Sequence, residues 1–292
     1  MAILIDYSQV AISSIMGQIN SRNFDGELNI DLVRHMILNG IRHYNKEFKE
    51  KYGDVVICCD DRDYWRKEIF PYYKANRKSD RAASDYDWKL IFDCLETVKQ
   101  ELRDHFPYKV VQVDRAEADD IIYVLVKYHS SPLEGGFEYE PCIIISGDKD
   151  FIQLHRYGDT SQWSPVQSKW VRGNPDKYLR EHILKGDRGD GIPNVMSKDD
   201  VFVTSGRQTP LRQKKIDEIN EDLEDGELLY AASWYANYCR NEQLIDLTKL
   251  PDEIKRNIVS EYHGQTAGDR SKMFNYFVNN KLKILMESIN EF

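Results

Sequence analysis

Residues Cys142-Ile143-Ile144-Ile145-Ser146-Gly147-Asp148-Lys149-Asp150 join a short apolar run to a turn that carries two aspartates. An apolar, β-branched run of this length followed by glycine is typical of a buried strand, here Cys142–Ser146. Three other stretches have the same form and are predicted to be strands as well: Ile3–Asp6, Val55–Asp60 and Lys109–Val113. The first half of the chain is therefore expected to build a sheet from four short strands.

The stretches between these strands carry apolar residues at helical spacing, at about 29–50, 85–105 and 116–129. Strands that alternate with helices of this length are typical of crossover connections, which place neighbouring strands parallel. The predicted fold class is α/β, with a mainly parallel central sheet flanked by helices.

After the fourth strand the pattern changes. Gln162-Trp163 and Lys169-Trp170-Val171 flank a turn at Ser164-Pro165 and predict a small hairpin. Beyond it the sequence lacks strand alternation and is typical of helices separated by glycine-rich turns. We therefore expect a boundary near residue 172, with an α/β domain at 1–172 and a helical subdomain at 173–292.

The composition favours an intracellular globular protein. The chain has 292 residues, 41% of them hydrophobic, and no apolar stretch approaches the roughly 20 residues of a membrane span. The apolar run Ala2–Ile5 is too short for a signal-peptide core and ends at Asp6. The five cysteines show no paired metal-ligand spacing. We expect a cytoplasmic location, without a zinc site or a membrane partner.

Acidic residues recur where the strands are predicted to end. In parallel α/β sheets ligands bind beyond the carboxyl ends of the strands. Four groups of carboxylates fall at or just after such ends, and a fifth lies in a glycine-rich turn after a helical stretch. The nine candidates, in chain order, are Asp6; Asp60; Glu117, Asp119 and Asp120; Asp148 and Asp150; Asp187 and Asp190.

Crowded carboxylates repel one another, so a cluster of them favours a bound cation. Hard oxygen ligands suit Mg²⁺, and Mn²⁺ can replace it. Two such ions about 3.5–4 Å apart can activate water for an in-line phosphoryl displacement. Simpler explanations exist for some members: Asp119 and Asp120 could favour the dipole at a helix start, and Asp148 and Asp150 could be turn or cap residues. Five groups converging on one sheet edge favour a metal centre.

The formal net charge of −9 argues against a nucleic-acid partner, but the charges are unevenly distributed. Residues 62–81 hold seven basic residues against three acidic ones. Five aromatic residues are interleaved with them, a pattern that suits a path for single strands, with cations on phosphates and rings on bases. The alternative is a solvated helix whose aromatic rings face the core.

A second basic group lies near a predicted helix start at Thr209-Pro210, where threonine would be the N-cap and proline the first helical residue. Its members are Arg207, Arg212, Lys214 and Lys215. The acidic chain therefore carries two local basic patches.

The ordered series of motifs resembles the 5′-nuclease family of flap endonucleases and 5′→3′ exonucleases, and within it the ribonucleases H of T-even bacteriophages. The resemblance covers nearly the whole chain. It rests on Ile5-Asp6-Tyr7-Ser8-Gln9, Cys59-Asp60, Tyr64-Trp65-Arg66, Tyr72-Tyr73-Lys74, Glu117-Ala118-Asp119-Asp120, Asp148-Lys149-Asp150, Trp163-Ser164-Pro165, Lys185-Gly186-Asp187 and Ser288-Ile289-Asn290-Glu291-Phe292.

This resemblance implies a PIN-like nuclease fold with two metal clusters. Asp6, Asp60, Asp119 and Asp148, with Asp120 close by, match the first cluster. Glu117, Asp150, Asp187 and Asp190 match the second. Arg66 and Lys74 match basic residues that the family aims at the scissile phosphate from an arch, here about 62–84, and Tyr73 matches an aromatic residue beside the terminal base.

The resemblance further implies metal-dependent hydrolysis of RNA or DNA at 5′ ends of duplex or flapped substrates, with RNA primer removal in phage replication as the role. Residues 173–292 resemble the duplex-binding subdomain. Implied partners are DNA, RNA–DNA hybrids, a single-stranded DNA-binding protein and a sliding clamp, and the chain is expected to be a monomer.

The sequence departs from the family pattern after Asp190. The family's turn reads Gly-Asp-x-x-Asp-Asn-Ile-x-Gly, whereas here Gly191-Ile192-Pro193-Asn194 follows, so that asparagine and glycine are exchanged. Both residue types tolerate positive φ, so the backbone of the turn is expected to survive. The chain also begins at the first strand, without a partner-docking peptide ahead of it.

Two other classes of function stay open from the residues alone. A PIN-like RNA-processing ribonuclease would share the carboxylates but leaves the basic segment and the helical last third unexplained. A non-catalytic DNA-binding replication protein would bind DNA independently of Mg²⁺ and leaves the paired carboxylates unexplained.

Overall fold

The contacts within the chain divide it into two units. A computed structural model describes residues 1–19, 29–130, 140–204, 206–226, 229–265 and 270–292. The first unit, called the sheet unit, consists of residues 1–62, 87–172 and 251–292. The second, called the helical unit, consists of residues 63–86 and 173–250.

The sheet unit is built on one six-stranded sheet with the order β3-β2-β1-β4-β5-β6. The five strands β1 to β5 pair parallel with their neighbours, and β6 pairs antiparallel with β5. The prediction of a mainly parallel sheet is confirmed, and so is the hairpin, which extends this sheet at one edge. The strands are β1 (Ala2–Asp6), β2 (Asp54–Cys58), β3 (Lys109–Val111), β4 (Cys142–Ile145), β5 (Thr160–Ser164) and β6 (Lys169–Val171).

The strand order places a topological switch in the middle of the sheet. The chain runs from β1 outward to β2 and β3, then returns to the other side of β1 to form β4. Ile5 is level with Ile57 of β2 and with Ile145 of β4, so these three strands end close together. The crevice beyond the carboxyl ends of strands at such a switch is where open α/β sheets bind ligands.

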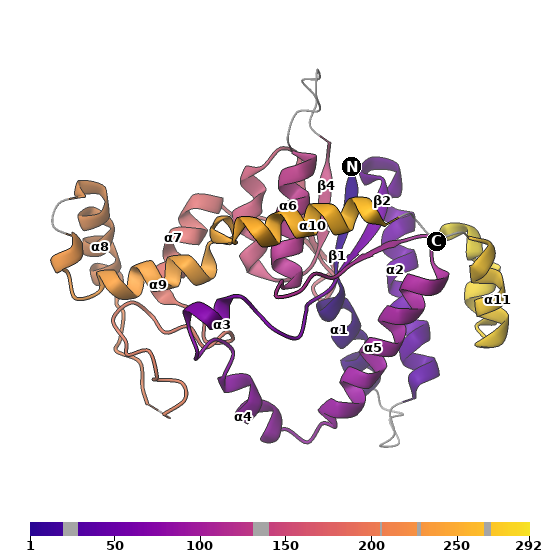
Figure 1. The fold of residues 1–292 in the computed structure, drawn as a ribbon, viewed down its shortest axis with the longest axis horizontal. Helices are drawn as coiled ribbons and strands as arrows, with labels where there is room; N and C mark the ends of the chain where they lie inside the picture. The colour runs from indigo at the N-terminus through magenta and orange to yellow at the C-terminus, as the bar shows by residue number, and fades with distance from the viewer. Residues whose placement is uncertain (20–28, 131–139, 205, 227–228, 266–269) are drawn as a thin grey trace. The chain divides into compact units, whose positions relative to one another are not determined.

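Helices cover both faces of this sheet (Figure 1). Alternate strand residues such as Ile3 and Ile5 pack in one large core with α1, α2, α5 and α11. The alternating residue Leu4 is equally buried, and α6, which contacts β1, β2 and β4, carries α10 beside it. The helices are α1 (Tyr7–Ile19), α2 (Ile30–Tyr52), α5 (Trp88–His105), α6 (Ala118–His129), α10 (Asp252–Gly264), α11 (Ser271–Asn279) and α12 (Lys283–Glu287).

The outer edge of β3 is closed by a side chain. The Val110 backbone N–H donates to Oε1 of Gln265 at 2.8 Å, and Nε2 of Gln265 donates to the Val110 carbonyl at 2.8 Å. The amide of Gln265, at the end of α10, thus makes the pair of hydrogen bonds that a further strand would make.

The helical unit joins two distant parts of the sequence. Residues 63–86 contribute α3 and α4, and residues 173–250 contribute α7, α8 and α9. Phe70 and Tyr73 of the first part pack with Ile183 and Leu244 of the second in one buried cluster. The helices are α3 (Arg66–Ile69), α4 (Asn76–Ala82), α7 (Pro175–Lys185), α8 (Gln213–Asp225) and α9 (Tyr235–Ile245).

The predicted helix start at Thr209-Pro210 is wrong, because α8 begins at Gln213 with Arg212 as its N-cap. Thr209 donates its N–H to Ser197 Oγ at 2.9 Å, and its carbonyl accepts from Asn194 Nδ2 at 2.9 Å. These tertiary hydrogen bonds hold Thr209 to residues 194–197 instead of to a helix. Among the residues that the structure describes, no helix is both long and apolar enough to span a membrane.

Candidate metal centre and nucleic-acid interface

Asp6 stands at the switch point and connects two strands. It is the last residue of β1, and its Oδ1 accepts from the Gln9 N–H at 3.1 Å, in the first turn of α1. Its Oδ2 accepts from Ser146 Oγ at 3.1 Å, just beyond β4. The side chain is therefore fixed at both oxygens in a site where only 8% of the residue is exposed.

The pKa of Asp6 is raised from 3.8 to about 7. Burial is the largest cause, the negative charges of Asp60 and Asp148 add to it, and the hydrogen bonds from Gln9 and Ser146 oppose it. The charges of Asp60 and Asp148 both act on Asp6, so these three carboxylates lie near one another beyond the ends of β1, β2 and β4. Three carboxylates that repel one another around a buried position form a donor set suited to a hard divalent cation.

Asp60 links the end of β2 to the start of α6. It lies two residues beyond the strand and is half-buried. Its Oδ2 accepts from Ser8 Oγ at 2.6 Å, and its Oδ1 accepts from the Ala118 N–H at 2.9 Å. The hydroxyls of Ser8 and Ser146 thus orient two carboxylates of the cluster, a role that the sequence reasoning did not assign to them.

Glu117 and Asp120 form the N-terminal cap of α6. The Asp120 carboxylate accepts from the Glu117 N–H at 3.0 Å, and the Glu117 side chain accepts from the Asp120 N–H. Glu117 is 1% exposed and Asp120 is fully buried, whereas Asp119 in the same turn is half-buried. The structure therefore gives Glu117 and Asp120 a capping function; a metal role for the three acids stays a prediction.

Asp148 and Asp150 begin the 3₁₀ helix Lys149–Arg156 that follows β4. Asp148 is exposed, and its Oδ1 accepts from the Asp150 N–H at 3.0 Å, so it is the N-cap of this helix. Gln162 of β5 donates to the Asp148 carbonyl at 2.6 Å and to the Ser146 carbonyl at 2.9 Å. This loop is fixed by β5 and presents Asp148 toward solvent.

In the helical unit, Asp187 lies in a turn that only glycine can close. Gly186 has φ 67°, and a Cβ there would lie 2.4 Å from the Ile192 carbonyl oxygen. Burial pushes the pKa of Asp187 upward, but hydrogen bonds from His182 and from the backbone of Asp190 outweigh it and hold the pKa below its ordinary value. His182 Nε2 lies 3.4 Å from Asp187 Oδ2. No sequence motif pointed to His182.

Asp190, four residues after Gly186, is engaged by the basic segment. Tyr73 donates its hydroxyl to Asp190 Oδ2 at 2.9 Å, and Arg77 Nη2 donates to Oδ1 at 2.6 Å. Lys74 Nζ lies 3.7 Å from the same Oδ1. The structure thus brings Tyr73, Lys74 and Asp190 together, and it adds Arg77, which the sequence reasoning counted among the basic residues but gave no role.

Arg66 and most of the aromatic residues of the basic segment lie in the interior of the helical unit. Arg66 is 2% exposed, its Nε donates to the Leu244 carbonyl at 2.8 Å, and its guanidinium lies over the Trp65 ring. Trp65, Phe70 and Tyr73 are buried, which matches the core alternative, whereas Tyr72 is 38% exposed. The rings available to a base are therefore fewer than the sequence pattern suggested.

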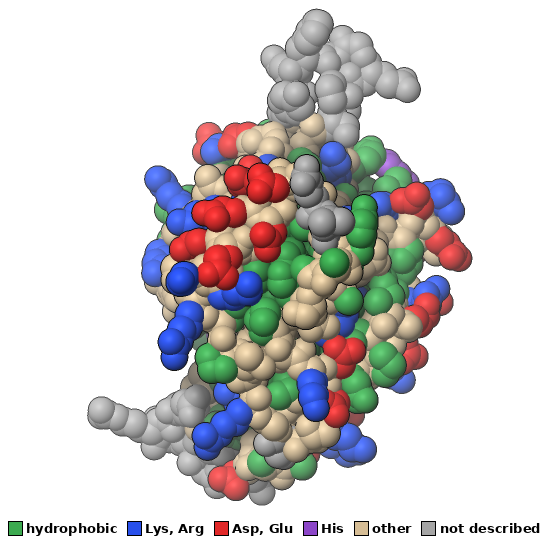
Figure 2. Space-filling view, turned by 90° about the vertical axis from the view of Figure 1, so that its left-hand side faces the viewer, with side chains coloured by type: hydrophobic (Ala, Val, Ile, Leu, Met, Phe, Trp, Pro, Cys, Tyr) green, Lys and Arg blue, Asp and Glu red, His purple; other side chains and the backbone are tan. Residues whose placement is uncertain are grey.

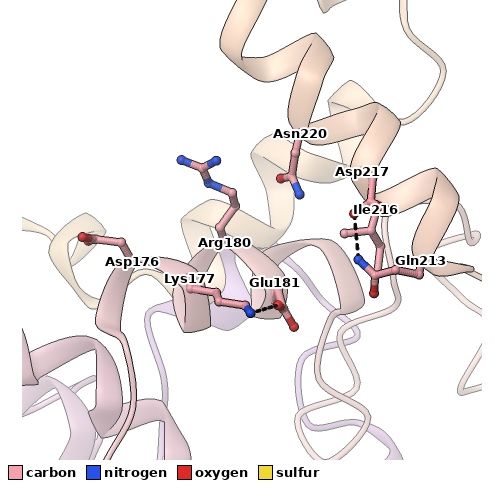
Figure 3. Close-up of a pocket in the computed structure, with 8 residues that line it drawn as sticks. All are labelled: Asp176, Lys177, Arg180, Glu181, Gln213, Ile216, Asp217 and Asn220. Atoms are coloured by element: carbon pink, nitrogen blue, oxygen red, sulfur yellow. Dashed lines mark hydrogen bonds and ion pairs between the residues drawn. The ribbon is translucent and has the colours of Figure 1, made fainter.

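Helix α8 presents exposed acidic side chains to solvent: Asp217, Glu221, Asp222, Glu224 and Asp225. Figure 2 shows a group of acidic side chains on one face of the protein. A pocket of about 410 Å³ lies between α7 and α8, and Figure 3 shows acidic, basic and uncharged side chains in its lining. Lys177 Nζ lies 3.9 Å from Glu181, and Gln213 donates to Asp217 at 2.8 Å. Three acidic and two basic side chains line the pocket, so it offers no positively charged path for a polyanion.

The family comparisons agree with this fold. Residues 2–181 match the family described as 5'-3' exonuclease, N-terminal resolvase-like domain, and residues 173–292 match the one described as T4 RNase H, C terminal. The chain belongs to the 5'-3' exonuclease family, and it is a nuclease of the class that includes 5′→3′ exonucleases and flap endonucleases.

Its relatives include one that matches over nearly the whole length. The ribonuclease H of Enterobacteria phage T4 is 38% identical over 298 residues, which cover 99% of this chain and 95% of that protein. A 5'-3' exonuclease of Streptomyces coelicolor is 26% identical over 50% of this chain and 52% of its own. The solved structure of the T5 D15 protein, co-crystallised with metal ions, has a TM-score of 0.57 at 15% identity and covers 89% of this chain and 98% of its own. This last likeness confirms the fold.

Proposed function

We propose that the protein hydrolyses phosphodiesters at the 5′ ends of duplex or flapped RNA and DNA, and that it removes RNA primers during phage DNA replication. The observation that carries the proposal is the group of Asp6, Asp60 and Asp148 at the switch point, where the carboxylates raise the pKa of Asp6. The ribonuclease H of phage T4, similar over the whole chain, supports the choice of substrate.

We propose Mg²⁺ as the resident ion at two positions, with Mn²⁺ able to replace it. The ligands proposed for the first position are Asp6, Asp60, Asp119 and Asp148, with Asp120 nearby; those for the second, on the family resemblance alone, are Glu117, Asp150, Asp187 and Asp190. Such ions lower the pKa of bound water and stabilise charge on a phosphate. The chain's own part is to hold these oxygens in place through Ser8, Ser146 and the cap of α6.

The proposed nucleic-acid contacts begin with the basic segment at about 62–84. Lys74, whose side chain is 12% exposed, is proposed to contact the phosphate. Tyr73 is proposed to lie near the terminal base. Arg66, which bonds to the backbone of α9, is proposed to hold the segment in shape for this contact.

Residues 173–292 are proposed to bind the duplex. The acidic face of α8 would repel a phosphate backbone, so the basic group directly before and at the start of this helix is the proposed contact. Its members Arg207, Arg212 and Lys214 are exposed. We further propose that the protein is a cytoplasmic monomer. We also propose that it binds a single-stranded DNA-binding protein and a sliding clamp, and co-sedimentation with each purified partner would test these two interactions.

One cleavage assay tests the main proposal. A 5′-labelled flap and an RNA–DNA hybrid are incubated with the protein, with and without Mg²⁺. The variant Asp119→Ala/Asp150→Ala is expected to lose cleavage by several orders of magnitude while it retains duplex binding, because it removes proposed ligands from both metal positions. Asp222→Ala/Asp225→Ala removes two exposed acids of α8 and is the matched control.

Turnover by the Asp119/Asp150 variant at the wild-type rate would contradict the metal assignment. Preferential cleavage of free single-stranded RNA over the flap would favour the PIN-like RNA-processing ribonuclease instead. Binding without any Mg²⁺-dependent cleavage would favour a replication protein that acts by binding DNA.

A further inference from the structure

A buried amide side chain spans the loop that carries Asp148. Gln162 of β5 is 1% exposed. Its Nε2 donates to the Ser146 carbonyl at 2.9 Å and to the Asp148 carbonyl at 2.6 Å. These two carbonyls lie on either side of Gly147, so a single carboxamide holds both ends of the loop 146–148 that follows β4.

His155 fixes the orientation of this carboxamide. Its Nε2 lies 3.1 Å from Oε1 of Gln162. Both amide hydrogens of Gln162 go to the two carbonyls, so its Oε1 faces the ring and accepts a hydrogen bond from it. Burial lowers the pKa of His155, against the opposing effect of the hydrogen bond with Gln162, so at pH 7 the ring is neutral. The single N–H of the ring is therefore assigned to Nε2.

The middle of the loop is held as well. The Gly147 N–H donates to Oε1 of Gln9 at 2.5 Å. A Cβ on Gly147 would lie 2.8 Å from Oγ of Ser164, which is itself 1% exposed in β5. The loop thus lies directly against β5, and only glycine leaves room for this close approach.

The position of the loop links two carboxylates of the candidate metal centre. The Asp148 N–H donates to Ser146 Oγ at 3.1 Å, and the same hydroxyl donates to Oδ2 of Asp6 at 3.1 Å. Asp6 is buried, whereas Asp148 is exposed. Because the packing of neighbouring side chains does not confine an exposed carboxylate, the place of Asp148 depends strongly on how its main chain is held.

We propose that Gln162, oriented by His155, is a positioning residue that holds Asp148 where it can share one divalent ion with Asp6. The inference rests on the proposed function, because both acids are among the ligands proposed for the first metal position. It gives β5 and His155 a part in metal binding. Residues that hold metal ligands in place change metal affinity by about 10- to 100-fold when they are replaced.

The test measures Mn²⁺ binding to the full chain without nucleic acid, from the electron paramagnetic resonance signal of free Mn²⁺ during a titration. Gln162→Met keeps the length of the side chain and loses all three hydrogen bonds. It is expected to bind Mn²⁺ about tenfold more weakly. His155→Phe removes only the hydrogen bond that orients the amide, and it is expected to bind roughly threefold more weakly.

The double variant His155→Phe/Gln162→Met is expected to bind Mn²⁺ no more weakly than Gln162→Met alone, because His155 acts through the amide that is already lost. In the cleavage assay, Gln162→Met is expected to need about ten times more Mn²⁺ for half of its maximal rate. Duplex binding in EDTA is expected to stay at the wild-type value. This combination separates a positioning role from a general loss of folding.

Asn45→Leu is the matched control. Asn45 of α2 is 3% exposed, and its Nδ2 donates to the Glu291 carbonyl at 2.8 Å. The substitution therefore also removes a buried carboxamide that donates to a carbonyl, but one outside the candidate metal centre. It is expected to lower the free energy of unfolding in urea and to leave Mn²⁺ affinity unchanged.

The inference is overturned if Gln162→Met binds Mn²⁺ like the wild-type protein, if Asn45→Leu loses as much affinity, or if the effects of the two single variants add up in the double variant. Circular dichroism shows whether Gln162→Met folds. If it does not, His155→Phe decides, and wild-type Mn²⁺ affinity of that variant overturns the inference.

Asp60→Asn distinguishes this failure from failure of the proposed function, because it removes a proposed ligand of the same metal position. If Asp60→Asn weakens Mn²⁺ binding and Gln162→Met does not, the positioning role alone is wrong. If the wild-type protein does not bind Mn²⁺, or if Asp60→Asn leaves the binding unchanged, the metal assignment of the proposed function is wrong.

Discussion

Asp6 combines two requirements that oppose each other. As the cap of α1 and the partner of Ser146 it is held in a buried position, while Asp60 and Asp148 surround it with negative charge. A buried carboxylate in such a field favours its protonated form, unless a cation neutralises it. The residue that best defines the site is therefore expected to destabilise the metal-free fold.

Replacement of Asp6 by asparagine is predicted to stabilise the metal-free protein, and more so at higher pH. The folded pKa of about 7 lies above the ordinary 3.8, so the folded state binds more protons between these values and loses stability as pH rises through them. Above pH 7 the stability gained by Asp6→Asn is on the order of 4 kcal/mol, and near pH 4 it is small.

Urea unfolding in EDTA at pH 4.5, 6 and 8 measures this effect. Asp225→Asn, an exposed acid, serves as the control and is expected to show no such trend. A gain from Asp6→Asn that is independent of pH would contradict the assigned environment of Asp6.

The turn after α7 is the element on which the basic segment depends. Gly191 has φ 72°, and a Cβ there would lie 3.0 Å from the Tyr72 carbonyl oxygen and 2.9 Å from Asn76 Oδ1. The glycine thus supplies both the backbone conformation and the space for residues 72–76. Of the two exchanged residues, Gly191 adopts positive φ. Asn194 is not among the described non-glycine residues with positive φ, and its Oδ1 accepts hydrogen bonds from the Met196 N–H and Ser197 Oγ.

Gly191→Ala is predicted to loosen the basic segment from the turn. The positive φ alone costs an alanine about 1 kcal/mol, and the contact with Tyr72 adds to it. Hydrogen exchange at the Lys74 N–H, which donates to Asp190, is expected to accelerate.

Gly226→Ala is the matched control, since Gly226 has φ 68° but its Cβ would meet nothing within 4 Å. It is expected to lose comparable stability from backbone strain without any change at Lys74. Unchanged Lys74 protection in Gly191→Ala would show that the turn does not hold the segment.

The sequence was most informative for elements with a clear local pattern. The four strands and the helices α2, α5 and α6 follow from apolar periodicity and were predicted within a few residues. Helix α1 was missed because it starts directly after β1 with no turn residue between them. Local pattern also failed at Thr209-Pro210, where hydrogen bonds to a distant segment decide the conformation.

The residues of the candidate site also fall into those that a local sequence pattern locates and those that it does not. The positions of Asp6, Asp60 and Asp148 follow from strand ends, which sequence can locate. The capping of α6 by Glu117 and Asp120, and the pairing of Asp190 with Arg77, depend on side-chain directions and on contacts between residues 113 positions apart. No periodicity encodes such contacts, so the sequence alone could not supply them.

At the scale of the whole molecule, divalent ions are predicted to raise the thermal stability of the protein. An ion that binds only the folded state adds about 2.7 kcal/mol at a concentration 100 times its dissociation constant. The ion would also neutralise the field around Asp6. Thermal unfolding of the protein without nucleic acid, in the presence and absence of Mn²⁺, measures the shift of the unfolding midpoint.

Asp60→Asn is expected to remove most of the Mn²⁺-dependent shift in thermal unfolding. Asp225→Asn, which replaces an exposed acid, is expected to retain the shift. Equal shifts in the two variants would indicate that the ion binds elsewhere on this acidic chain.

The amide of Gln265 has a consequence for the order in which the protein forms during synthesis. Val110 leaves the ribosome 155 residues before the side chain that covers its backbone. At several residues per second, this edge of the sheet stays open for roughly ten seconds or more. During that interval a nascent chain exposes a strand edge that can pair with another copy. Chains synthesised side by side on one messenger RNA are therefore expected to associate through this edge.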